Sequence, residues 1–169
     1  MASVSLRLVK PASEQPCSTE TAPITLRFLG DPAPQGSKTV SRFGGVREAS
    51  AKLMPWRHTV QYQADQQYKG QPLTGAVTAS FEFIMPRAKS HYSKAKGREH
   101  ELLPSAPDRH ISTPDLDKLI RGLMDALQVK CGGNVLREDC QVDDIRYMRK
   151  RYQDGPDEPC GAIVHLWPG

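Results

Sequence analysis

The sequence predicts one small α/β (α+β) domain in which two helices pack on a β-sheet. Two stretches have apolar residues at helical spacing, several short stretches alternate apolar and polar residues, and 169 residues suit a single core. The chain is 38% hydrophobic and contains 14 prolines and 13 glycines, so long loops and a modest core are expected. The predicted domain covers 24–169, and 1–23 is predicted to be a flexible extension.

Two segments are predicted to form helices. Residues 55–68 start with a proline, which suits a first helical turn, and Trp56 is expected in the core. The second helix is predicted within 113–127, where Ser112, Thr113 and Pro114 mark the start as capping and first-turn residues. This second segment has one continuous apolar stripe, formed by Leu116, Leu119, Ile120, Leu123, Met124 and Leu127.

Four segments are predicted to form the main strands. Residues 24–29 and 77–85 alternate in polarity, which indicates strands with one buried face. Residues 145–151 and 162–167 are predicted as the two later strands, and 41–46 as a tight hairpin tip.

A basic segment at 87–110 has no apolar period, so it is either functional or mobile. We favour contact with a nucleic-acid backbone, and with an exposed base through Tyr92, over a solvated excursion. The net charge of +4 allows a polyanionic partner without requiring one. Lys38 in the loop 34–38 could bind a phosphate, although ordinary surface loops contain such residues too. The candidate contacts in the basic segment are Arg87, Lys89, His91, Tyr92, Lys94 and Lys96.

The four cysteines lack the paired CxxC spacing of a zinc module, and no apolar run approaches the roughly 20 residues of a membrane helix. We therefore expect free thiols and a soluble, cytoplasmic protein without a membrane partner. The cysteines are Cys17, Cys131, Cys140 and Cys160.

Acidic residues gather near the start of the second predicted helix. On a regular helix Asp115 and Asp117 would point about 200° apart. The residue before a proline favours extended backbone geometry. The helix could therefore begin only around Asp115, and both carboxylates could then converge at its N-terminus. Simple capping is the alternative, since acidic residues favour a first helical turn. A second acidic group follows at Glu138, Asp139, Asp143 and Asp144.

Three or four carboxylates at one point repel one another unless a cation compensates them, and hard oxygen ligands suit Mg²⁺, with Mn²⁺ as a substitute. Such a site suits phosphodiester hydrolysis, in which Arg121 or Lys118 could neutralise developing charge. Arg149 and Arg151 on the following strand could contact DNA phosphates, although an ordinary charged strand edge explains them nearly as well.

These residues resemble the motifs of the RusA family of Holliday-junction resolvases. The resemblance rests on Asp115-Leu116-Asp117-Lys118-Leu119, Asp125-Ala126-Leu127 and Asp139-Cys140-Gln141-Val142, and extends loosely over 24–167 toward phage-associated members. It implies a mixed α/β homodimer that cuts branched DNA with Mg²⁺ in a bacterial or phage-infected cell. By this resemblance Asp115, Asp117 and Asp139 are the metal-binding catalytic carboxylates. A dimer also suits a four-way junction, which has approximate two-fold symmetry and needs two matching cuts.

Two positions depart from the family pattern. Arg121 stands where a catalytic lysine is expected, and a guanidinium cannot give up a proton near neutral pH, so Arg121 can bind phosphate but cannot be the base. Glu138 replaces an aspartate before Asp139, so Glu138, Asp139 or Asp143 could complete the metal shell, and we favour Asp139. The alternative functions are a non-catalytic dimer that binds branched DNA and a metal nuclease directed at flaps or RNA.

Overall fold

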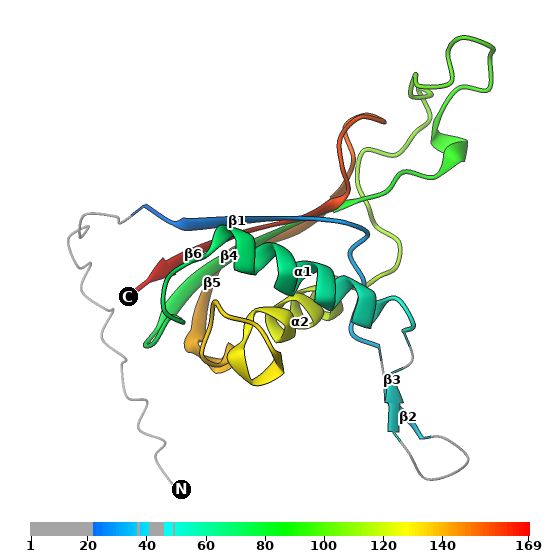
Figure 1. Cartoon of the computed structure of the whole chain (residues 1–169). Helices are drawn as coiled ribbons and strands as arrows, with labels where there is room; N and C mark the ends of the chain where they lie inside the picture. The colour runs from blue at the N-terminus through cyan, green and yellow to red at the C-terminus, as the bar shows by residue number, and fades with distance from the viewer. Residues whose placement is uncertain (1–21, 37, 41–45, 49) are drawn as a thin grey trace, which may run out of the picture.

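The computed structural model describes residues 22–36, 38–40, 46–48 and 50–169, and it has the mixed sheet and two helices that the sequence predicts (Figure 1). The main sheet has four strands in the order β1-β6-β4-β5. Strand β6 pairs antiparallel with β1 and β4, whereas β5 pairs parallel with β4. The bounds are β1 Ile24–Leu29, β4 Val77–Met85, β5 Val142–Tyr152 and β6 Gly161–Pro168.

Helix α1 (Leu53–Gln67) packs on the sheet through one apolar face and begins two residues earlier than predicted. Trp56 on this face is only 3% exposed, which confirms its predicted place in the core. Two glutamines of α1 also bond the outer edge of β1. Gln67 bonds the backbone N–H and C=O of Arg27, and Gln63 does the same for Leu29. Part of an open strand edge is thereby satisfied by side chains.

Helix α2 (Leu116–Leu127) lies within the predicted segment, begins after Asp115 rather than at residues 112–114, and lies on the same face of the sheet as α1 (Figure 1). It connects β4 to β5, because two parallel strands need a crossover between them. The loop before β2 (Lys38–Val40) crosses α2 closely at Gly122, where a Cβ atom would lie 3.0 Å from the Ala33 carbonyl oxygen. In the same place the backbone N–H of Gln35 donates to the Lys118 carbonyl at 2.9 Å.

The prediction of one buried face for β4 is wrong, because both faces are buried. Ser80 and Glu82 on the face away from the helices are 0% and 7% exposed. Arg149 and Arg151 of β5 reach Glu82 at 2.6 and 2.7 Å and cover it. Burial raises the pKa of Glu82, but the hydrogen bonds from these two arginines outweigh it and hold that pKa below its ordinary value.

The basic segment 87–110 projects from the sheet as a long loop, as predicted, with one short 3₁₀ turn η1 (Lys89–His91) (Figure 1). Its base packs around Tyr152 of β5. His91 and His110 contact the Tyr152 ring at centroid distances of 5.1 and 4.6 Å, and the Arg87 guanidinium stacks over it at 5.0 Å. We call this projecting loop the basic arm.

Several predictions fall wholly or partly outside the described residues. The strands β2 and β3 (Val46–Glu48) form the predicted hairpin, but its tip at 41–45 lies outside, as do Cys17 and residues 1–21 of the predicted extension. Cys131, Cys140 and Cys160 are free thiols, as expected. Among the described residues, no helix has the length and apolar character needed to cross a membrane.

Candidate active site at the start of helix α2

Asp115 is the N-cap residue of α2 and has extended backbone, with φ −68° and ψ 143°. The predicted start of the helix at this residue is therefore confirmed. Its side chain makes no capping hydrogen bond, and instead lies 2.7 Å from the ammonium of Lys118 one turn later. The hydrogen bond and the charge of Lys118 hold the pKa of the Asp115 carboxyl below its ordinary value.

Asp117 lies in the first turn of α2 and lines a different space, a hollow of about 350 Å³ between α2 and β5. Asp139 lines the same hollow from η3 (Asp139–Gln141), and Arg121 lines it from the next turn of α2. The remaining wall is mostly apolar and includes Ile120, Met124, Ile145 and Met148. We call this space the Asp117 hollow.

The predicted meeting of three carboxylates at one point is not found. Asp115 lines a separate cavity with Lys118, which we call the Asp115 cavity, and within the described residues no group of three His, Cys, Asp or Glu side chains could hold a metal ion. Although the backbone of Asp115 is extended, its side chain lines a different cavity from the side chain of Asp117, so the extended start of the helix does not make the two carboxylates converge. The structure therefore brings together Asp117 and Asp139 and leaves Asp115 with Lys118.

Glu138 and Asp143 do not line the Asp117 hollow. Both line another depression on the far side of η3. Glu138 also caps η3: its side chain accepts from the backbone N–H of Gln141, while the Gln141 side chain accepts from the Glu138 N–H at 2.8 Å. Of the three candidates for the last carboxylate, Asp139 is thus the one that shares a hollow with Asp117.

The Asp117 hollow suits a hard divalent cation. Magnesium in proteins is usually held by one or two carboxylates and completes its shell with waters and substrate phosphates. Asp117 and Asp139 supply two such groups, and neither forms an ion pair within the part of the chain that the structure describes. Arg121 lines the same hollow and could meet a phosphate there.

Residues 30–157 match the sequence model of the family described as Endodeoxyribonuclease RusA. The chain belongs to this family. The match spans both helices, strands β4 and β5 and the Asp117 hollow, and it confirms the resemblance seen in the acidic motifs. No curated protein matches the chain at a significant level.

Two further RusA motif residues hold the frame of the site. Asp125 is ion-paired with Arg57 of α1 and accepts a hydrogen bond from the Gln128 side chain at 3.1 Å. Gln141 donates to the carbonyls of Leu73 and Gly75 at 2.9 and 3.0 Å, which fixes η3 against the loop before β4. Sequence reasoning missed both roles, because the partners lie more than sixty residues away along the chain.

Lys150 is a third residue whose structural role sequence reasoning missed. Its ammonium donates to the carbonyls of Ser112 and Pro114 at 2.5 Å each, so it holds the segment that leads into Asp115. The alternation of side chains along a strand could have predicted this role. Arg149 and Arg151 point to one face of the sheet, so Lys150 between them points to the other face, which carries the helices.

The predicted DNA contacts divide into two groups. Arg149 and Arg151 are bonded to Glu82, Arg87 donates to the Gln153 and Pro107 carbonyls, and His91 packs on Tyr152. In the basic arm Lys89, Lys94 and Lys96 are exposed, and Tyr92 is half-buried in a bridge to Leu102. The side chain of Lys38 lies outside the described residues.

Proposed function

We propose that the chain is a magnesium-dependent endonuclease that resolves Holliday junctions and other branched DNA by paired phosphodiester hydrolysis. One observation carries the proposal: in a RusA-family chain, two carboxylates from separate segments, Asp117 and Asp139, line one hollow beside Arg121. Acidic pairs of this kind suit Mg²⁺, or Mn²⁺ in its place, and basic groups beside them suit a phosphodiester.

In this proposal Asp117 and Asp139 hold the metal ion. When bound, the ion supplies the polarisation of the phosphodiester and the lowered pKa of an attacking water. Arg121 binds a phosphate oxygen and offsets the charge that develops there, but its guanidinium cannot accept a proton as a base. Ile120 and Met124 exclude bulk water from one side of the hollow, which strengthens the electrostatic contacts within it.

Asp115 would contribute differently from the other two carboxylates. Its pairing with Lys118 places an ammonium beside the helix start, where it can meet the DNA backbone. The exposed lysines of the basic arm add sequence-independent phosphate contacts, so binding should weaken as salt increases.

Strand β5 supports the proposed homodimer. It forms an edge of the sheet, and its apolar side chains Ile145, Tyr147 and Met148 are 40%, 42% and 51% exposed. An open edge strand with exposed apolar side chains offers a surface on which another chain can pack, and Ile145 and Met148 also line the Asp117 hollow. A second copy on β5 would place two cutting sites near one two-fold axis.

Replacing Asp139 by Asn tests the proposal. We expect the D139N variant to bind a four-way junction but to lose magnesium-dependent cutting, whereas D143N, changed on the far side of η3, should cut like the wild type. The measurement is junction cleavage over a magnesium titration. Full cutting by D139N would contradict the assignment.

The Asp115–Lys118 ion pair favours one alternative, a non-catalytic dimer whose aspartates only pair with basic residues. That protein would bind junctions in a salt-dependent way and would never release a metal-dependent product. A panel of flaps, RNA and four-way junctions in the same assay separates the third possibility, a nuclease with another preferred substrate.

A further inference from the structure

The face of the main sheet that lies away from the helices carries side chains that the proposed cutting does not use. Both helices pack on the other face, and no helix of the described residues covers this one (Figure 1). We call this surface the open face. Its exposed and half-buried side chains come from three strands and include Thr25, Arg27, Tyr147, Arg149, Ile163, His165 and Trp167.

Three aromatic rings stand side by side on the open face. His165 lies between the other two, with its ring centroid 6.5 Å from that of Tyr147 and 6.0 Å from that of Trp167. A hydrogen bond of 2.9 Å between the Thr25 hydroxyl and Nδ1 fixes the His165 ring. Ser80 of β4 is in register with both Tyr147 and His165 and is fully buried. Aromatic rings on a sheet surface suit stacking by unpaired nucleobases, because every base has a π face.

Arginines surround these rings. The Cζ atom of Arg146 lies 4.1 Å from the centroid of the Trp167 ring, so this guanidinium stacks on the indole. Arg149 bonds Glu82, yet its side chain is 61% exposed and part of its guanidinium still faces solvent. Arg27 of β1 is also exposed. A guanidinium can bond phosphate oxygens and can stack on a base, so one surface offers contacts to both parts of a nucleotide.

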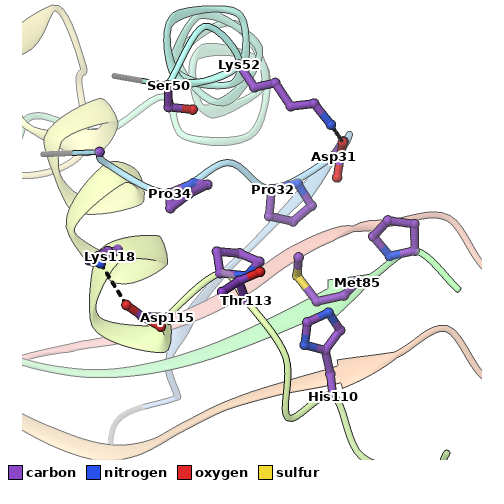
Figure 2. A pocket seen from close by; sticks show the side chains of 13 residues that line it. Asp31, Pro32, Pro34, Ser50, Lys52, Met85, His110, Thr113, Asp115 and Lys118 are labelled. Atoms are coloured by element: carbon purple, nitrogen blue, oxygen red, sulfur yellow. Dashed lines mark hydrogen bonds and ion pairs between the residues drawn. The ribbon is translucent and has the colours of Figure 1, made fainter. Parts of the chain in front are cut away.

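The cations of the open face are less compensated than those around the Asp115 cavity. At the rim of that cavity Lys118 pairs with Asp115, and Lys52 pairs with Asp31 at 2.9 Å, as the dashed lines of Figure 2 show. On the open face Arg27 has no ion-pair partner within the described part of the chain. Its charge is therefore available to an anion.

Carboxylates are fewer than arginines on the strand residues of the open face. Glu82 is buried beneath two of these arginines, and Asp144 lies near one end of the face, in register with Thr78. An excess of positive charge suits a polyanion. The arginines are Arg27, Arg146, Arg149 and Arg151.

The other end of the open face has a small hollow of about 160 Å³. Arg27 lines it, and the one carboxylate among its lining residues, Glu158, is paired with Arg151 at 2.6 Å. Along β6 the four residues from Trp167 to Ile163 span about 13 Å, so the rings and the hollow lie along one strand. The apolar part of the lining includes Ile84, Pro159 and Ile163.

We propose that the open face binds a single strand of DNA, with unpaired bases on the aromatic rings and phosphates at Arg27 and Arg149. Paired bases are stacked on one another and cannot offer their faces, so a duplex should bind this surface more weakly. A second copy paired edge to edge on β5 would leave the face uncovered, because strands pair within the plane of the sheet. The open face is separate from the Asp117 hollow, so this binding goes beyond the proposed cutting and does not depend on it.

The test titrates a single-stranded oligothymidylate into the full chain without divalent metal, so that no cutting occurs, and follows tryptophan fluorescence. Binding should quench Trp167 in a saturable way, whereas Trp56 is only 3% exposed and is out of reach. W167F should still bind a dye-labelled oligothymidylate but should lose the quench. A duplex at the same concentration should leave the emission unchanged. Saturable binding that does not alter Trp167 emission would place the strand elsewhere, for example on the basic arm, and would overturn the proposal.

A charge variant gives a second readout. R27A should raise the Kd for oligothymidylate about tenfold, because it removes a charge-assisted phosphate contact. R137A removes an exposed arginine beside η3 and is the matched control. An R27A variant that binds like the wild type would overturn the proposal. So would a Trp167 emission that changes with protein concentration but not with DNA, because a second copy would then cover the face. Oligothymidylate binding without any junction cleavage would defeat the proposed function and leave the open face standing.

Discussion

The Asp115 cavity and the Asp117 hollow lie on two sides of the start of α2, and they differ in whether a basic side chain pairs with their carboxylates. On one side Asp115 is neutralised within the chain by Lys118, in a cavity with proline walls. On the other side Asp117 and Asp139 share a hollow without an ion-pair partner in the described part of the chain, and Arg121 stands beside them. Two aspartates that are neighbours in a motif thus have different electrostatic surroundings. The proposed cation site therefore lies at Asp117 and Asp139 rather than at Asp115.

The largest effect on cutting is expected from replacing Asp117, which has no ion-pair partner in the described part of the chain. D117N should lower kcat for junction cleavage by roughly 100-fold or more, because it removes a carboxylate that would hold the proposed metal ion, and the ion stabilises charge at the reacting phosphate. D115N should lower it by about tenfold or less, since the Asp115 charge is already met by Lys118. Single-turnover cleavage of one junction by both variants compares the sides directly. Equal losses would mean that the two aspartates act together on one ion.

Both sides depend on α2 being held in place. Arg57 and Asp125 join the two helices and their side chains are only 14% and 18% exposed. D125N should lower the free energy of unfolding by about 2 kcal/mol, less than the roughly 3–5 kcal/mol for a fully buried pair. Urea unfolding measures this, and D65N, changed on the exposed side of α1, should match the wild type. A D125N midpoint equal to that of the wild type would show that the pair does not stabilise the frame.

Replacing Lys150 tests the Asp115 cavity separately from the Asp117 hollow, because Lys150 bonds the segment that leads into Asp115. K150M should raise KM for the junction about tenfold through two lost charge-assisted hydrogen bonds, with the magnesium concentration for half-maximal rate unchanged. K130M, which removes an exposed charge after the other end of α2, is the control. If K150M instead shifts the magnesium requirement, Asp115 belongs to the metal site.

The smallest effect concerns the ionisation of Asp115. Lys118 lowers the pKa of this carboxyl from its ordinary value of 3.8, so K118M should return the pKa toward 3.8. A depressed folded-state pKa means that the pair stabilises the fold above about pH 3.8 and that this contribution is lost as the pH falls through the lower value. Carboxyl ¹³C NMR follows the titration, with K130M as the control. If the titration midpoint of the Asp115 carboxyl is the same in K118M and in the wild type, Lys118 does not lower the pKa of Asp115.

The sequence by itself determined the main helices and strands and the family to which the chain belongs. Apolar spacing predicted α2, the alternation at 77–85 predicted β4, and the acidic motifs identified the region of the candidate site. These features depend on residues within a turn or two of one another, so local patterns are enough to predict them. The resemblance to the RusA family rested on the same short motifs and was confirmed.

Only the tertiary structure decided which side chains meet. It separated Asp115 from Asp117, placed Asp139 rather than Glu138 in the hollow, and buried Glu82 beneath two arginines of β5. It also gave Arg87 a structural role at the base of the arm. Each of these outcomes depends on a partner tens of residues away, whose position is set by strand register and helix packing. The spacing of apolar residues within one segment contains no information about which residues of a distant segment its side chains will contact.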